Sequence, residues 1–312
     1  MTSSVRIGKR DRSYYTYQTA LCIFLAAVMI IFGKEMRTGI YDGLVFSFTT
    51  IIPTLFPFFI LSDLWSTVFK IRQEGLLSRL FERIFSINGQ GLSAWLSGMI
   101  CGFPVGIKVA RELYDGGDIS LDELEDLSGF VNNPSVAFVI SGVGVGVLGS
   151  IKLGILLYIS LTVSAVAVGV IFRRNRSNSH KTQDNSRQPF NLSKSIINAG
   201  TTSVAVVSCI SAFSGILSLL SSIINNGLIF CLISPFLEVS NAIRMICGSE
   251  LITYHVRLSL IAFSLGFSGL SVHLQAFAFL PAELSRARYL LMKLTQGIIS
   301  SVFTYFTFLI FK

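Results

Sequence analysis

The chain has 312 residues and a formal net charge of +8, from 25 Lys and Arg against 17 Asp and Glu. Charged residues make up 13% of the chain and hydrophobic residues 52%, whereas soluble domains usually carry about 25% charged residues. A soluble protein of this length needs more charge to cover its surface. The composition therefore excludes an ordinary soluble domain and predicts an all-α polytopic membrane protein.

Stretches without Asp, Glu, Lys or Arg predict the membrane segments: 13–33, 43–62, 84–107, 127–151, 153–172, 195–237, 258–282 and 294–311. A helix needs about 20 residues to cross a hydrocarbon layer of roughly 30 Å. The stretch 195–237 is long enough for two crossings, so we expect eight or nine membrane segments. The stretches are continuously apolar, which favours helices over the alternating pattern of membrane strands.

The N-terminal region, residues 1–39, has four basic residues between positions 6 and 12 and then an apolar stretch over 14–32. A signal peptide has an apolar core of about 7–15 residues and a small-residue cleavage pattern. This stretch is longer and ends in Gly-Lys-Glu, which predicts an uncleaved first helix.

The segment 173–190 is a polar, basic linker between a first membrane repeat, 40–172, and a second, 191–312. Its basic residues and those of the N-terminus predict that both lie in the cytoplasm, with the chain in the plasma membrane. We interpret this charge as a topology signal, and we expect the lipid bilayer and no nucleic acid as a partner.

The number of membrane crossings in the first half predicts a re-entrant hairpin. Residues 43–69 return the chain to the cytoplasmic side, and 74–88 have the pattern of an interfacial helix. Three apolar segments remain before the cytoplasmic linker, so one of them enters and leaves on the same side. The segment 84–107 is the candidate because it is interrupted by Gly102-Phe103-Pro104-Val105-Gly106. Interrupted backbone at membrane depth is buried in protein or lines a wet cavity.

A similar interruption, Gly266-Phe267-Ser268, lies in the second half. Interrupted apolar segments at corresponding positions of two halves are typical of transporters built from inverted repeats. We therefore expect two inverted repeats with broken or re-entrant hairpins.

Polar residues at membrane depth are the candidate binding residues, because burial there is costly. Lys108 follows the first interruption, where a cation beside a helix N-terminus suits a carboxylate; alternatively it reaches the cytoplasmic interface. Asn132 and Asn133 are expected to cap the helix that Pro134 begins, and binding of substrate is a further role that the sequence leaves open.

Glu238 ends the longest uncharged run. It is a candidate site for a coupling proton or cation, or else it pairs with Arg244. His273 and Gln275 follow the second interruption, and hydrogen bonds between helices are the simpler explanation of both.

Signatures of enzymes are absent from the sequence, which contains no H-E-x-x-H, G-x-S-x-G or Walker motif. The five cysteines are scattered through apolar segments, so neither a disulfide framework nor a zinc site is expected. We expect no cofactor and no metal. The acidic residues of 112–126 are interpreted as a solvated helical hairpin, because no calcium-loop spacing occurs there.

Motifs over about residues 40 to 300 resemble the YlbJ (stage V sporulation) family of integral membrane proteins. In chain order they are 52–62 (IPTLFPFFILS), Gly102-Phe103-Pro104-Val105-Gly106-x-Lys108, Asn132-Asn133-Pro134-Ser135, Leu237-Glu238-Val239-Ser240-Asn241, Gly266-Phe267-Ser268-Gly269-Leu270-Ser271-Val272-x-x-Gln275 and Lys293-x-x-Gln296-Gly297. That family is similar to the nucleoside-recognition, or Gate-domain, group related to concentrative nucleoside transporters.

The resemblance implies transport of dipicolinic acid from the mother cell toward the forespore, across the outer forespore membrane of a sporulating, Gram-positive-type cell. It implies a site between two broken hairpins, made of Gly102, Phe103, Pro104, Val105, Gly106, Lys108, Asn132, Asn133, Glu238, Gly266, Phe267, Ser268 and Gln275.

Small-organic-anion transport thus leads, and two alternatives remain. One is transport of a nucleoside or nucleobase, for which the amides offer neutral hydrogen bonds. The other is a structural or assembly protein of the sporulation membranes. A homo-oligomer is compatible with each of them.

Overall fold

The computed structural model describes residues 9–68, 75–174 and 191–310, and every regular element within them is a helix. The predicted all-α fold is confirmed. Most of the linker predicted over 173–190 lies outside the described residues.

The first half is ordered as a long helix with a π-helical turn, a short helix, two interrupted pairs and a second long helix. After α1 (Lys9–Ile31), these elements are α2 (Gly33–Phe46), η1 (Ser47–Ile51), α3 (Ile52–Val68), α4 (Leu76–Phe85), α5 (Gly91–Cys101), α6 (Val105–Asp115), α7 (Leu121–Val131), η2 (Phe138–Val147) and α8 (Ile151–Ile171).

The second half repeats that order without a counterpart of α4: α9 (Leu192–Ile223), α10 (Gly227–Leu237), α11 (Val239–Gly248), α12 (Tyr254–Phe267), α13 (Gly269–Phe279) and α14 (Arg286–Ile310). The order of elements pairs α5–α6 with α10–α11, and α7–η2 with α12–α13. The similar motifs at Gly102 and Gly266 therefore lie in elements that do not correspond, and the correspondence predicted from those motifs was wrong.

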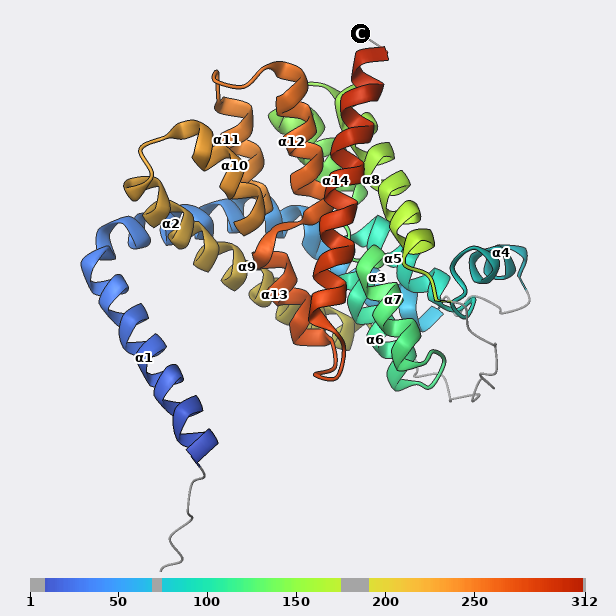
Figure 1. The fold of residues 1–312 in the computed structure, drawn as a ribbon. Coiled ribbons are helices and arrows are strands. Elements are labelled where there is room, and N and C mark those ends of the chain that lie inside the picture. The colour runs from blue at the N-terminus through green and yellow to red at the C-terminus, as the bar shows by residue number, and fades with distance from the viewer. Residues whose placement is uncertain (1–8, 69–74, 175–190, 311–312) are drawn as a thin grey trace, which may run out of the picture.

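The pairs α5–α6 and α10–α11 are hairpins of short helices. With 10 or 11 residues, each helix is about 16 Å long, roughly half the thickness of the hydrocarbon layer. In Figure 1, α10 and α11 lie in the upper part of the molecule, and α5 and α6 lie in the lower right part. These lengths and places fit hairpins that reach the middle of the membrane from opposite sides.

The apolar run 195–237 does not hold the two crossings that the sequence predicted. It forms one continuous 32-residue helix, α9, followed by the 11-residue α10. Among the described residues, four helical stretches are long and apolar enough to cross a membrane: Gly33–Leu61, Ile151–Ile171, Leu192–Ile223 and Tyr254–Phe279. Shorter apolar helices, including α5, η2 and α10, make up much of the rest.

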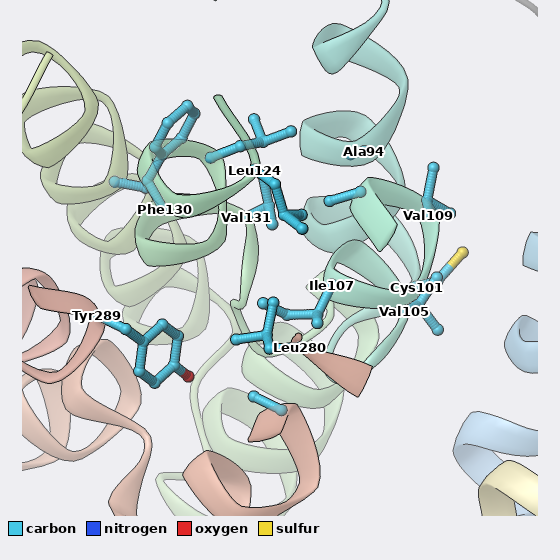
Figure 2. Close-up of a cluster of buried hydrophobic side chains, with 14 of the residues drawn as sticks. Ala94, Cys101, Val105, Ile107, Val109, Leu124, Phe130, Val131, Leu280 and Tyr289 are labelled. Carbon is cyan, nitrogen blue, oxygen red and sulfur yellow. The ribbon is translucent and has the colours of Figure 1, made fainter. Parts of the chain in front are cut away.

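A buried core joins the two halves. Figure 2 shows Ile107 of α6 beside Leu280 of the second half, within one cluster that also contains Ala94, Leu124 and Tyr289. Ile107, Leu124 and Tyr289 have no exposed surface, and close packing joins α7 to α14 and α6 to α13.

The acidic segment forms the predicted helical hairpin, α6–α7, but only part of it is solvated: Asp115 and Asp122 are exposed, whereas its last acidic residues are buried. Glu125 and Asp126 of α7 are buried and face Arg174, at the end of α8, and Arg288, at the start of α14. Arg288 donates to Asp126 Oδ1 at 2.8 Å and to the Phe172 carbonyl oxygen at 2.6 Å. These ion pairs tie the middle of α7 to the end of α8 and the start of α14.

Candidate functional site

A cavity lies where interruptions from both halves meet. The cavity is nearly closed, since its volume is about 20 Å³, little more than the room that one water molecule needs. Gly102 and Phe103 line it from the α5–α6 interruption, Ser135 from the α7–η2 interruption, and Glu238 from the α10–α11 interruption. Gln275 of α13 completes the polar lining together with Ser240 and Ser271.

The interruptions touch in pairs, one pair in each half. Gly102 has φ 86°, and a Cβ there would lie 2.7 Å from the backbone nitrogen of Ser135. A Cβ at Gly269 would lie 3.1 Å from the Leu237 carbonyl, next to Glu238. In each half the tip of the hairpin therefore rests directly on the break of the neighbouring broken helix.

Helix starts point at this cavity. Gly102 and Phe103 precede α6, Ser240 lies in the first turn of α11, and Ser271 lies in the first turn of α13. The first turn of a helix leaves backbone N–H groups without a partner in the helix, and the helix dipole is positive there. Such ends favour anions.

Glu238 is buried, with 1% of its surface exposed, and its carboxylate caps α11. Oε1 accepts from the Ser240 backbone N–H at 3.0 Å and Oε2 from the Asn241 backbone N–H at 2.7 Å. No ion pair with Arg244 occurs in the part of the chain that the structure describes, so that alternative was wrong. The charge of Glu238 is instead stabilised by the start of its own helix.

Two buried polar atoms of the lining have no partner among the described residues. Ser271 Oγ and Gln275 Oε1 make no hydrogen bond, although the two residues are 0% and 3% exposed. Buried polar groups are normally satisfied. Their position in the lining indicates that they face a ligand or water.

The other predicted site residues lie around the cavity rather than in its lining. Pro104, Val105 and Gly106 are buried at the start of α6, and Lys108 is half-buried one turn further on. Gly266 packs against Gly297, Phe267 packs among aromatic rings, and Ser268 forms the left-handed break itself with φ 75°.

The sequence predicted that Asn132 and Asn133 cap the helix that follows them, and this prediction was wrong. Ser135 caps that helix, since its hydroxyl accepts from the Phe138 backbone N–H at 3.1 Å. The two asparagines belong instead to a buried polar network behind the cavity.

Lys293 of α14 is the centre of this network, with no exposed surface. Its Nζ donates to the Asn132 carbonyl oxygen at 2.7 Å and to Gln296 Oε1 at 2.6 Å. Gln296 Nε2 in turn donates to Asn133 Oδ1 at 2.6 Å. Within the described ranges, no carboxylate pairs with Lys293.

Tyr289 extends the network to α13. Its hydroxyl accepts from Asn132 Nδ2 at 2.7 Å and lies 3.2 Å from His273 Nδ1. The α7–η2 interruption is therefore held in place by side chains of α13 and α14.

Lys293, Gln296 and Tyr289 were not predicted as site residues. Lys293 stands at the edge of an apolar run, where a single charge usually marks the membrane interface. The motif Lys293-x-x-Gln296-Gly297 was the available signal, since it places both polar side chains on one helix face.

Comparison with known proteins gives one informative relative. No family model and no solved structure matches the chain. The "Sporulation integral membrane protein YlbJ" of Bacillus subtilis (strain 168) is 26% identical in an alignment that covers 90% of this chain and 79% of that protein. Together with the apolar helices, this similarity supports an integral membrane protein of the YlbJ type, the family whose motifs the sequence resembles.

Proposed function

We propose that the protein transports a small organic anion across a sporulation membrane, by alternating access at the cavity between the interrupted helices. The observation that carries the proposal is the meeting of interruptions from both halves around unpartnered polar atoms. Discontinuous helices in paired halves are the usual way in which transporters build a site at the midplane of the membrane.

The chemistry of the lining favours a small, flat anion. Phe103, Phe138 and Val272 supply apolar walls, and the starts of α6 and α13 supply positive dipole ends, since Glu238 already caps the start of α11. Glu238 does not oppose the anion strongly, because both its oxygens already accept backbone N–H groups of α11.

Dipicolinic acid is the proposed substrate, and it is the substrate that the family resemblance implies. It is a planar pyridine ring with a carboxylate on each side, so its ring matches the apolar walls and its carboxylates match the helix starts. The printed name of the Bacillus subtilis relative supports a role in sporulation. We place the protein in the outer forespore membrane with its N-terminus in the cytoplasm.

A nucleoside or nucleobase is the second candidate. Gln275 Oε1 and the hydroxyl of Ser271 offer the neutral hydrogen bonds that such a solute needs. Neither Asn132 nor Asn133 lines the cavity, which removes two of the amides that favoured this candidate.

Uptake of labelled dipicolinate into proteoliposomes tests the proposal, with labelled uridine as the parallel substrate. We expect saturable dipicolinate uptake that falls at least tenfold in Gln275→Leu. Leu274→Ala is the matched control, because Leu274 is the neighbouring residue of α13 and is 53% exposed. Uptake of uridine alone would favour the second candidate, and folded protein that moves neither solute would favour a structural role.

A further inference from the structure

A second hollow opens beside the cavity, between α2, α9, α10 and α11. Its volume is about 370 Å³. We call it the groove, and its polar lining includes Asp42, Ser218, Ser221, Asn241 and Arg244. Charged side chains within membrane segments usually face a water-filled cavity, which indicates that the groove is wet.

Three elements line both the groove and the cavity. The continuous helix α2–η1–α3 lines the groove at Asp42 and the cavity at Ile51. Likewise α9 lines the groove at Ser218 and the cavity at Ile210, eight residues away, or about 12 Å along the helix. The N-terminal turn of α11 separates the two hollows, with Ser240 in the cavity and Asn241 in the groove.

The interval between the two hollows contains two buried hydroxyl groups. Ser47 and Ser211 lie in it, on the two long helices, and their hydroxyls are buried without a partner among the described residues. Ser47 also begins the π-helical turn η1, and such turns frequently occur at functional sites. Apolar packing alone would leave no reason for two unsatisfied hydroxyls here.

A side-chain hydrogen bond joins α11 to α9 at the end of the groove nearer the cavity, and both of its residues line the groove. Asn241 Nδ2 donates to Ser214 Oγ at 2.7 Å. A Cβ on Gly43 of α2 would lie 2.7 Å from the same oxygen. Three helices therefore meet closely at this point.

We infer that the groove is the vestibule through which a carboxylate solute reaches the cavity. Arg244 binds the carboxylate of the solute in the groove, and the Asn241–Ser214 contact is the gate between the groove and the cavity. Arg244 is exposed in the groove, with its guanidinium 5.3 Å above the Phe46 ring. Guanidinium groups bind carboxylates in a bidentate manner. The inference rests on the proposed function, because it makes the groove the route from one side of the membrane to the proposed transport site.

Cysteine labelling tests the path without any substrate. The full-length chain is used with the less buried Cys22, Cys209 and Cys247 replaced by Ala. Ser218→Cys reports on the groove, and Ser47→Cys reports on the interval. The probe is an anionic, membrane-impermeant methanethiosulfonate reagent.

We expect Ser218→Cys to react at least tenfold faster than Val204→Cys, the control on the lipid-exposed face of α9. Ser47→Cys should react slowly and speed up at least tenfold when Asn241→Ala opens the gate. Equal rates for Ser218→Cys and Val204→Cys would overturn the vestibule, and an unchanged rate for Ser47→Cys would overturn the gate.

Uptake kinetics test Arg244. Arg244→Gln should raise the KM for dipicolinate about tenfold with little change in maximal rate, and Arg244→Lys should recover part of the affinity. Lys152→Gln is the control for charge, since Lys152 is another exposed cation. An unchanged KM in Arg244→Gln would overturn its role. A wild-type chain that takes up no dipicolinate would contradict the proposed function, and the labelling rates would still decide whether the groove and cavity connect.

Discussion

At the scale of single residues, the buried Lys293 is the main feature that the sequence analysis did not predict. An unpaired ammonium group is costly to bury, and here it is satisfied by a backbone carbonyl and an amide oxygen rather than by a carboxylate. The carbonyl belongs to Asn132, at the α7–η2 interruption. Lys293 is thus a positioning residue that holds the interruption beside the cavity.

Replacement of this lysine tests the role. Lys293→Met leaves two buried acceptors without a donor, each worth about 1–3 kcal/mol. We expect a lower unfolding temperature in detergent, together with lower dipicolinate uptake. Lys152→Met is the control at an exposed position. A double-mutant cycle of Lys293→Met with Gln296→Leu should show a coupling energy, and strictly additive effects would contradict the hydrogen bond between them.

At the scale of elements, ion pairs of Glu125 and Asp126 with Arg174 and Arg288 join the middle of α7 to the end of α8 and the start of α14. Asp126 is 2% exposed, so its charge depends on these partners. The pairs fix α14, and with it Lys293, against the α7–η2 interruption.

Loss of one partner should therefore destabilise the fold. We expect Arg288→Ala to lower the free energy of unfolding by about 3 kcal/mol, the low end for breaking a buried pair, because Arg174 still faces Asp126. Asp115→Asn breaks an exposed pair with Arg111 and should cost less than about 1 kcal/mol. Both free energies of unfolding are measured in detergent. Equal losses in the two variants would contradict a larger contribution of the buried ion pairs to stability.

The interruptions could be predicted because they carry local signals. Gly102 and Pro104 break a helix by their own backbone chemistry, and Ser268 follows a Gly-Phe step. The long helix α9 could not be predicted as one element, because an uninterrupted apolar run fits two spans as well as one long helix followed by a short one. The network at Lys293 joins residues about 160 positions apart, and no local pattern reports such a contact.

At the scale of the whole molecule, two halves with the same order of interrupted helices enclose a cavity. Hairpins from opposite sides, α5–α6 and α10–α11, contribute their tips to its lining. A structure in which each half supplies half of the site suits alternating access, since movement of one half against the other opens the cavity to one side at a time.

The most direct test compares dipicolinate uptake by the wild-type chain, Gly102→Val and Gly200→Val. Gly102 contacts Ser135 at the cavity and has φ 86°, whereas a Cβ on Gly200 meets nothing within 4 Å. Gly102→Ala, a smaller change, is included in case the valine variant does not fold. We predict saturable uptake by the wild-type chain and Gly200→Val, and at least a tenfold loss in the folded Gly102 variants. Uptake by folded Gly102→Val at the wild-type rate, or no uptake by any folded chain, would contradict transport through this cavity.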